Sequence, residues 1–528
     1  MLKHALSCCV ASALMAASPT ALSEQNEGQQ GVSQQQTLAP LMVAAENRGI
    51  EDQYIVVLKQ PMTLSDDPQA LKTFTQQAVS SMANQHAVKV EKVFDRSLSG
   101  FVAKLTPAQL RALRMDWQVD FIEQDKTISL DPVITPDANQ NNPVWGLDRI
   151  DQRNLPLDNN FNTNFDGTGV TAYVIDTGVT TSHVEFGGRA RSGYDFVDND
   201  QDATDCNGHG THVAGTIGGS QYGVAKNVDI VGVRVLSCSG SGSTSGVIDG
   251  VDWVAANANG PSVANMSLGG GVSTALDRAV ASAVQSGVSF MLAAGNSNAD
   301  ACNSSPAREP SGVTVGSSTV RDTRSSFSNW GSCLDVFAPG SDIKSAWYDG
   351  SYRTISGTSM ATPHVAGVAA LYLQENSSLS PVQLANLISN RASVDKINDP
   401  RGSVNKLLYS QADSSCEPNC GTEPDPKGEL KNGQALTDIS GGQGAQRFFY
   451  VDVDAGQRLT VNISGGSGDA DLYLRYGSKP TLNNWDCRPY NYGNSEVCTV
   501  QNTLKGRYHV MLNGYAAAFS GVSVTARY

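Results

Sequence analysis

The chain has 528 residues, too many for a single hydrophobic core, so we expect several domains. Apolar residues make up 40% of the chain and charged residues 17%, a composition typical of globular proteins. The formal net charge of −14 argues against nucleic acid as a partner, because contacts with phosphate require a basic surface.

The N-terminus predicts a secretory signal peptide over residues 1–23. Lys3 and His4 form a short basic start, an apolar run extends from Ala5 to Ala17, and Ala21 to Ser23 form a small-residue exit. The alternative, a buried helix, is disfavoured at this extreme end of the chain. No other apolar run is long enough to span a bilayer, so we expect a secreted, extracellular protein without a membrane span.

A small domain is predicted next, over about residues 54–130. Its strand and helix patterns follow one another as β-α-β-β-α-β, an order typical of a ferredoxin-like α+β fold. Thr106 and Pro107 indicate a helix start, because Thr caps helices and Pro suits the first helical position. A stretch rich in Pro, Asn and Asp follows and is suited to proteolytic cleavage.

From residue 145 to 409, apolar strands alternate with helices, which predicts a doubly wound, mostly parallel α/β sheet with helices on both faces. We expect strands at 169–176, 229–236, 261–268, 289–296 and 312–318, and helices at 209–219, 244–258, 273–287, 359–374 and 380–392. A polar boundary covers residues 410–429. Short alternating strands without a helical pattern then predict a small β-sandwich over residues 430–528.

Eight cysteines remain once the signal peptide is set aside, and an even number in an exported chain indicates disulfides. The sequence leaves their connectivity open, and we take pairing in chain order as a hypothesis. The eight are Cys206, Cys238, Cys302, Cys333, Cys416, Cys420, Cys487 and Cys498.

Three polar residues stand at the ends of predicted elements of the α/β domain. Asp176 ends a strand, His209 begins a helix between two glycines, and Ser359 begins another helix after a Gly. A serine hydroxyl becomes a good nucleophile when a neutral imidazole accepts its proton, and a carboxylate orients that imidazole. The chain order Asp, His, Ser is that of subtilisin-type enzymes. Asn296, together with the backbone N–H of Ser359, could stabilise an oxyanion.

The motifs YVIDTGV, NGHGTHVAGTIGG, NMSLGG, AAGN and ISGTSMATPHVAG resemble the subtilisin superfamily of serine proteases, and WGLDRIDQ resembles its proteinase K branch. The resemblance covers about residues 145–409 and implies Asp176 as orienter, His209 as general base and acid, Ser359 as nucleophile and Asn296 as oxyanion donor. It also implies an inhibitor-type propeptide at residues 24–139, a catalytic domain at 140–409 and a prepeptidase C-terminal domain at 430–528.

The same resemblance assigns a substrate-binding groove. The segment around Gly240 resembles an edge strand that pairs with substrate backbone. Uncharged small residues suggest a roomy apolar pocket for aromatic or aliphatic side chains before the scissile bond, although tight core packing would also explain these glycines. Ser243 to Ser245 replace a Tyr that some relatives carry, which suggests a more open distant pocket. The candidates are Gly240, Ser241, Gly242, Ser267, Leu268, Gly269, Ala293, Ala294 and Gly295.

Acidic loops suggest structural calcium, which prefers six to eight oxygen ligands. Solvated surface acids are the alternative, above all for the third set, while no catalytic cofactor is expected. The first set, Asp335 with the carbonyls of Pro310 and Gly312, is implied by the resemblance to the family, one of whose sites it matches. The second comprises Asp148, Asp151, Gln152, Asp158 and Asn160, and the third Asp195, Asp200 and Asp202.

The overall expectation is a secreted, monomeric serine endopeptidase that processes itself, with its propeptide bound as a product-like inhibitor. A zinc site at Cys206, His209 and His212 is disfavoured, because no HExxH motif is present. An α/β-hydrolase is excluded by the position of Ser359 after the Asp and His. The remaining alternative is an adhesion protein with an inactive protease scaffold, binding through Tyr473, Trp485, Tyr490 and Tyr492.

Overall fold

The computed structural model describes residues 38–44, 48–60, 68–130, 133–134 and 143–411, and most of residues 428–528. In the last region the masked positions are 442–445, 478, 481–484, 490–492, 502, 504–505 and 515–518. The expected signal peptide, the boundary near residue 139, and Cys416 and Cys420 lie outside the described residues. No helix in the described ranges is long and apolar enough to cross a membrane.

The N-terminal domain (residues 39–130) has the expected ferredoxin-like fold, with strand order β1-β5-β2-β4-β3. Its sheet begins before residue 54, because β1 pairs with β5 and β2 starts at residue 49. Thr106 caps α2 with both bonds of a capping box. The elements are β1 (Leu41–Met42), β2 (Gly49–Leu58), α1 (Pro68–Gln85), β3 (Val90–Phe94), β4 (Gly100–Lys104), α2 (Pro107–Met115) and β5 (Val119–Ser129).

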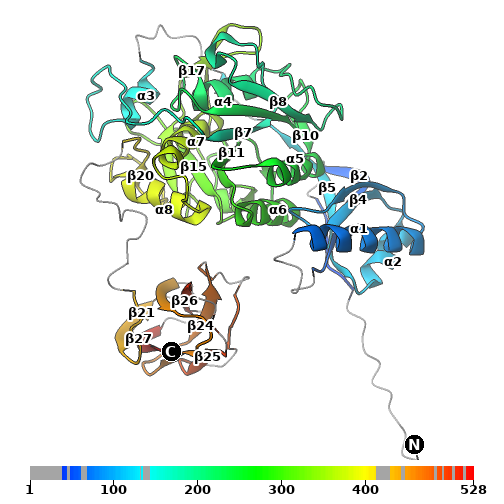
Figure 1. The fold of residues 1–528 in the computed structure, drawn as a ribbon, viewed down its shortest axis with the longest axis vertical. Coiled ribbons are helices and arrows are strands. Elements are labelled where there is room, and N and C mark those ends of the chain that lie inside the picture. The colour runs from blue at the N-terminus through cyan, green and yellow to red at the C-terminus, as the bar shows by residue number, and fades with distance from the viewer. Residues whose placement is uncertain are drawn as a thin grey trace, which may run out of the picture. The chain divides into compact units, whose positions relative to one another are not determined.

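The central domain (residues 143–411) is built on a nine-stranded sheet in the order β19-β20-β16-β15-β13-β11-β7-β9-β8, parallel except for β19 (Figure 1). The five expected strands are present as β7 (Thr171–Asp176), β9 (Asp229–Arg234), β11 (Ser262–Met266), β13 (Ser289–Ala293) and β15 (Val313–Ser318). The others in the sheet are β8 (Ala190–Asp195), β16 (Val336–Pro339), β19 (Ser393–Val394) and β20 (Lys406–Leu407).

Helices cover both faces of this sheet. The apolar residues of α4 (His209–Gly218), α7 (Thr358–Glu375) and α8 (Pro381–Arg391) belong to one buried cluster, and those of α5 (Thr244–Asn257) and α6 (Thr274–Gln285) to another. Both faces of the sheet are therefore shielded from water, which explains why its strands are apolar at consecutive positions. Smaller elements are α3 (Trp145–Ile150), η2 (Val184–Phe186), η3 (Ala301–Asn303), β6 (Val133–Ile134), β10 (Ser241–Ser243), β12 (Gly270–Gly271), β14 (Ser304–Ser305), β17 (Ile343–Ala346) and β18 (Tyr352–Ser356).

The C-terminal domain (residues 428–528) is the expected antiparallel β-sandwich, with sheets β21-β27-β23-β25 and β22-β26-β24 around one apolar core. Tyr473 is fully buried, so it cannot serve as a binding aromatic in the adhesion alternative. The strands are β21 (Ala435–Gly441), β22 (Gln446–Val453), β23 (Leu459–Ser464), β24 (Ala470–Tyr476), β25 (Glu496–Val500), β26 (Gly506–Gly514) and β27 (Phe519–Arg527).

Three disulfides join the cysteines that chain order pairs: Cys206–Cys238, Cys302–Cys333 and Cys487–Cys498. The first two lie in the central domain and the third in the C-terminal domain. Cross-links of this kind stabilise a fold mainly by restricting the unfolded chain.

Candidate active site

The fold brings Asp176 and His209 into direct contact. Asp176 is the last residue of β7, and His209 is the first residue of α4. The Nδ1 atom of His209 lies 2.8 Å from Oδ1 of Asp176, and the backbone N–H of Thr177 donates to the same oxygen. Both side chains are buried, so the carboxylate fixes the ring and favours the tautomer with its proton on Nδ1.

Two glycines let His209 approach the strand so closely. Gly208 has φ +112°, and a Cβ there would lie 2.2 Å from the ring of Trp347. A Cβ at Gly210 would lie 2.1 Å from the carbonyl oxygen of Gly178, in the loop after β7. The Gly-His-Gly sequence is therefore required by packing on both sides of the imidazole.

Ser359 lies in the first turn of α7 and is 5% exposed. Its hydroxyl donates to the carbonyl oxygen of Ser267 at 3.1 Å, while Nε2 of His209 has no hydrogen-bond partner among the described residues. The hydrogen-bonded row expected from the sequence is thus formed between Asp176 and His209 but not between His209 and Ser359.

Asn296 is held by the residue before Ser359. The backbone N–H and the hydroxyl of Thr358 donate to Oδ1 of Asn296 at 2.8 Å and 2.9 Å, and Thr358 Oγ1 accepts from the N–H of Gly295. With Oδ1 engaged in this way, the amide group of Asn296 has a fixed orientation beside Gly357, where its N–H groups can serve a developing oxyanion. The sequence pattern did not single out Thr358.

The expected edge strand is already paired with the N-terminal domain. Ser241, Gly242 and Ser243 of β10 lie opposite Ser129, Ile128 and Thr127 of β5 in antiparallel register. Leu130 continues the pairing by donating its N–H to the carbonyl of Gly240. Beyond it, β6 pairs with β18, which directly precedes Gly357. The N-terminal domain and the segment that follows it thus pair with two strands of the central domain, one of which leads directly into the Ser359 turn.

The other residues expected to bind substrate differ in their surroundings. Ser267, Leu268 and Ala293 are buried close to the Ser359 turn or in the sheet core, and Gly269 is partly exposed. Ala294 instead belongs to a separate buried cluster with Ala301, Ala307 and Leu334. At Gly295, φ is +100° and a Cβ would lie 2.5 Å from the amide of Asn329, so this glycine is needed for packing.

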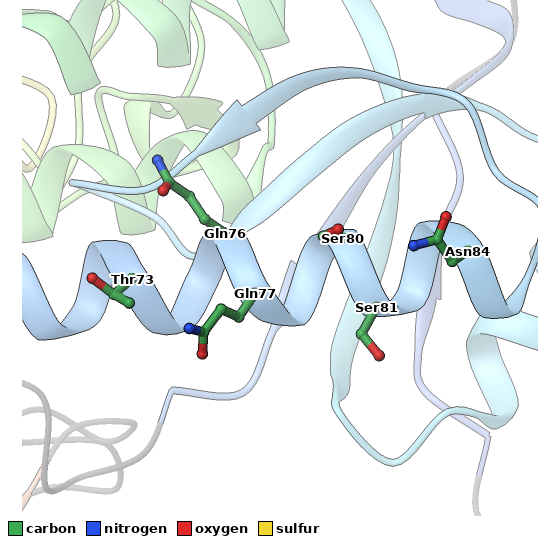
Figure 2. A pocket seen from close by; sticks show the side chains of 6 residues that line it. All are labelled: Thr73, Gln76, Gln77, Ser80, Ser81 and Asn84. Atoms are coloured by element: carbon green, nitrogen blue, oxygen red, sulfur yellow. The ribbon is translucent and has the colours of Figure 1, made fainter.

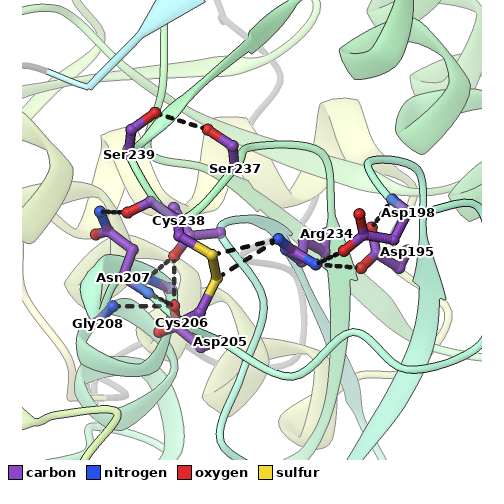
Figure 3. The surroundings of a disulfide bond; sticks show 12 residues. Asp195, Asp198, Asp205, Cys206, Asn207, Gly208, Arg234, Ser237, Cys238 and Ser239 are labelled. Carbon is purple, nitrogen blue, oxygen red and sulfur yellow. Dashed lines mark hydrogen bonds and ion pairs between the residues drawn. A yellow bond between two sulfur atoms is a disulfide. The ribbon is translucent and has the colours of Figure 1, made fainter.

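A disulfide links the two segments that carry His209 and the edge strand (Figure 3). Cys206 lies three residues before His209, and Cys238 lies two residues before Gly240. The guanidinium of Arg234 lies between the sulfur atoms and the carboxylates of Asp195 and Asp198. Arg234 and Asp198 were not singled out from the sequence.

The zinc alternative has no support in this geometry. Cys206 is engaged in the disulfide, and Nε2 of His212 lies 2.9 Å from the carbonyl of Ile343. Burial lowers the pKa of His212 to about 3, so its ring is neutral. Within the described ranges, no three His, Cys, Asp or Glu side chains converge as a metal site.

In two of the three sets proposed for calcium, burial raises the pKa of a carboxyl group. Burial raises the pKa of Asp335 to about 6, and a cation beside this carboxylate would offset its desolvation. Burial also raises the pKa of Asp151 to about 6, and the neighbouring charges of Asp158 and Asp148 raise it further. The loop folds back on itself there, because Gln152 Oε1 and Asp148 accept hydrogen bonds from the N–H of Asp158.

The third set does not suit calcium. Asp195 places Oδ2 2.5 Å from Arg234, and its Oδ1 accepts from the backbone N–H groups of Val197 and Asp198. The guanidinium therefore already occupies the position that a cation would need. Oδ1 of Asp200 and of Asp202 accepts turn hydrogen bonds, and both residues are exposed.

The sequence did not single out two acidic groups at the contact between the N-terminal and central domains. Asp125 accepts from the N–H and hydroxyl of Ser245 in the first turn of α5, and Glu123 accepts from the N–H of Ala275 in the first turn of α6. Carboxylates at these positions satisfy free N–H groups and complement the helix dipoles. A contact between domains distant in sequence leaves no local pattern.

A carboxyl group of α6 lies close to this contact. Burial raises the pKa of Asp277 to about 7, and the charges of Glu309 and Glu123 raise it further, whereas Ser305 and Arg308 lower it. On the other side of the N-terminal domain, a shallow depression along α1 is lined by uncharged polar side chains only (Figure 2). That depression offers no group for acid–base chemistry or metal binding.

Comparison with known proteins gives matches over all three domains. Residues 167–422 match the model described as Subtilase family, residues 53–131 that of Peptidase inhibitor I9, and residues 446–514 that of Bacterial pre-peptidase C-terminal domain. The chain is 68% identical over 535 residues to the alkaline serine exoprotease A of Vibrio alginolyticus, with 100% of both chains covered.

Two further relatives match a part of this chain. The extracellular serine proteinase of Thermus sp. (strain Rt41A) is 48% identical over 386 residues, covering 70% of this chain and 92% of that protein. A crystal structure of a cold adapted subtilisin-like serine proteinase is 80% identical with a TM-score of 0.52, covering 52% of this chain and 100% of that chain.

Proposed function

Because the chain belongs to the subtilase family of serine proteases, we propose that Ser359 is its nucleophile, His209 its general base and acid, and Asp176 the orienter of the imidazole. The observation that carries this assignment is the buried 2.8 Å contact between His209 Nδ1 and Asp176, with the opposite ring nitrogen left without a partner among the described residues. Such a nitrogen is able to accept the proton of a serine hydroxyl.

The reaction proceeds by acyl transfer. Ser359 rotates away from the carbonyl of Ser267, gives its proton to Nε2 of His209 and attacks the peptide carbonyl. Asn296 and the backbone N–H of Ser359 stabilise the oxyanion, and Asp176 stabilises the imidazolium. His209 returns the proton to the leaving amine, and water then releases the acyl-enzyme by the same steps in reverse.

Substrate binds by adding a strand to β10, through Gly240, Ser241 and Gly242. The support is the pairing of this strand with β5, which shows that its backbone groups can accept an extended partner. The pocket for the residue before the scissile bond is formed by Ser267, Leu268, Gly269, Ala293 and Gly295 and carries no charge. We therefore propose an endopeptidase that prefers aromatic or aliphatic residues at that position.

Peptides blocked at both ends test this proposal, because an exopeptidase needs a free terminus. The Vibrio relative bears the name exoprotease. We expect hydrolysis of a blocked tetrapeptide anilide ending in Phe, with kcat/KM at least about tenfold above the same peptide ending in Asp, since an uncharged pocket cannot compensate a buried charge. Hydrolysis of unblocked peptides only, or equal rates for Phe and Asp, would contradict it.

The N-terminal domain acts as an intramolecular inhibitor of the secreted precursor and is removed by self-cleavage. It occupies β10, the strand proposed to bind substrate, over Thr127 to Leu130. Charged contacts fasten it to α5 and α6: Lys92 pairs with Asp249, Asp252 accepts from Ser97, and Arg278 pairs with Asp120. A domain bound at this strand excludes a substrate backbone.

Release of the inhibitor is expected to be faster at pH 8 than at pH 5. In the complex, the pKa of Asp277 is about 7, mainly because of its burial, and the charge of Glu123 in the N-terminal domain raises it. Departure of that domain removes the Glu123 charge, so we expect the pKa of Asp277 to be lower in the separated enzyme. The complex therefore holds a proton that the separated enzyme loses, so its stability is full below that lower pKa and declines as the pH rises to about 7.

The measurement is the lag before activity appears in freshly processed protein at the two pH values. Asp277→Asn should bind the inhibitor more tightly at pH 8 and weaken the pH dependence, while Asp229→Asn, at an exposed position, should leave both unchanged. A lag that shortens as the pH falls would contradict the linkage.

Calcium stabilises the fold at two sites, one at Asp335 with the carbonyls of Pro310 and Gly312, the other in the loop 148–160. We expect a chelator to lower the melting temperature of the active enzyme by about 5–10 °C relative to millimolar calcium. Asp335→Asn and Asp148→Asn should each remove part of that shift. Asp200→Asn is the matched control, and an unchanged melting temperature on chelation would remove the proposal.

A further inference from the structure

A buried amide lies in the middle of the central sheet, two residues before Ser267, which contacts the proposed nucleophile. Asn265 is the fourth residue of β11, between β7 and β13, and is fully buried. Its neighbours Val263, Ala264 and Met266 are buried and apolar. Its Oδ1 atom has no hydrogen-bond partner among the described residues. A buried acceptor without a partner destabilises a fold, so packing gives no reason for an Asn here.

The other end of this amide begins a chain of hydrogen bonds that ends on Ser359. Nδ2 of Asn265 donates to Oγ of Ser267 at 2.8 Å, and that hydroxyl donates to the backbone carbonyl of Ser359 at 2.8 Å. A serine hydroxyl has one proton, which Ser267 gives to Ser359. Its oxygen must therefore accept from an N–H group, and Asn265 supplies one.

We propose that Asn265 is a positioning residue for the reaction. Acting through the Ser267 hydroxyl, it holds the first turn of α7 in the position from which the Ser359 hydroxyl can reach Nε2 of His209. The inference rests on the proposed role of Ser359. Ser267 contacts this turn twice, since its carbonyl also accepts from the Ser359 hydroxyl. Both contacts depend on where Ser267 lies, and the rigid strand that carries Asn265 fixes that position.

Asn265→Ala in the full chain tests this, assayed after processing with the blocked Phe peptide. We expect kcat to fall about tenfold, the equivalent of one hydrogen bond, with KM within about twofold. The rate of inactivation by a serine-directed phosphonyl reagent should fall in the same proportion, because it reports the reactivity of Ser359 without a peptide. Purely structural damage would lower the melting temperature and leave both constants near their wild-type values.

Ser267→Ala should lower kcat similarly, and the double variant Asn265→Ala/Ser267→Ala should be no slower than Ser267→Ala within about twofold, because both act through one hydroxyl. Asn405→Asp is the control, since the side chain of Asn405 bonds to the backbone of Ile397, away from the Ser359 turn. Should Asn265→Ala fail to fold, Asn265→Leu takes its place, because leucine has a similar shape and no side-chain N–H donor. An unchanged kcat for either single variant, or multiplying effects in the double variant, overturns the inference. Activity retained by Ser359→Ala would instead overturn the proposed function.

Discussion

Replacing Ser359 with alanine is expected to reduce the hydrolysis of casein and of the blocked Phe peptide by about a millionfold. Removal of the serine of subtilisin costs about 10⁶ in kcat, a measured value for that member of the family. The physical reason is the loss of the acyl-enzyme route, which leaves only the oxyanion donors and substrate binding to act on water.

The same variant should keep its N-terminal domain attached, because self-cleavage needs the same hydroxyl. Intact mass after expression in a host without other exported proteases measures this directly. Ser351→Ala is a matched control, since Ser351 is exposed and its hydroxyl donates to Asp349 in the same surface turn. A fully trimmed Ser359→Ala protein, or one that clears casein at the wild-type rate, would show that another group performs the chemistry.

Replacing Asp176 with asparagine is expected to lower kcat by about 10⁴. The asparagine amide would have nearly the same shape, but it is neutral, so the negative charge that favours a proton on Nδ1 of His209 is lost. The carboxylate that stabilises the imidazolium is lost as well. Because the contact is fully buried, water cannot take over either role.

Steady-state kinetics of Asp176→Asn with the blocked Phe peptide measures this loss, which should appear in kcat and leave KM within a few-fold. Asp166→Asn is the control, because Asp166 accepts from Thr168 and Asn227 in a surface loop. A loss smaller than about tenfold would mean that His209 is oriented by something other than this carboxylate.

The long elements could be predicted from the sequence because each has its own apolar period. The helices at α4, α5, α6, α7 and α8 and the five central strands were expected within about four residues of their observed ends. Short strands could not be predicted in this way. β10 is Ser-Gly-Ser, with no apolar alternation, and it pairs only with β5, which lies more than a hundred residues earlier in the chain.

The residues of the candidate site show the same difference between local sequence motifs and contacts with distant segments. Asp176, His209, Asn296 and Ser359 stand in long motifs beside glycines, so their positions could be found without coordinates. Thr358 and Arg234 act by contacts between distant segments, and a single sequence carries no trace of such pairs. Asn265 bonds to Ser267 two residues later, but the link from Ser267 to Ser359 is again a contact between distant segments. Calcium was expected at Asp195 because its loop is acidic. That loop gave no sign that Arg234, from another segment, would occupy the cation position.

One measurement tests the central assignment most directly: the mass of tryptic peptides after the processed enzyme reacts with a serine-directed phosphonyl reagent. The account predicts one adduct per molecule, on Ser359, formed in step with loss of activity, and almost no adduct in His209→Ala or Asp176→Asn. An adduct on a different residue, or full activity after Ser359 is completely labelled, would contradict it.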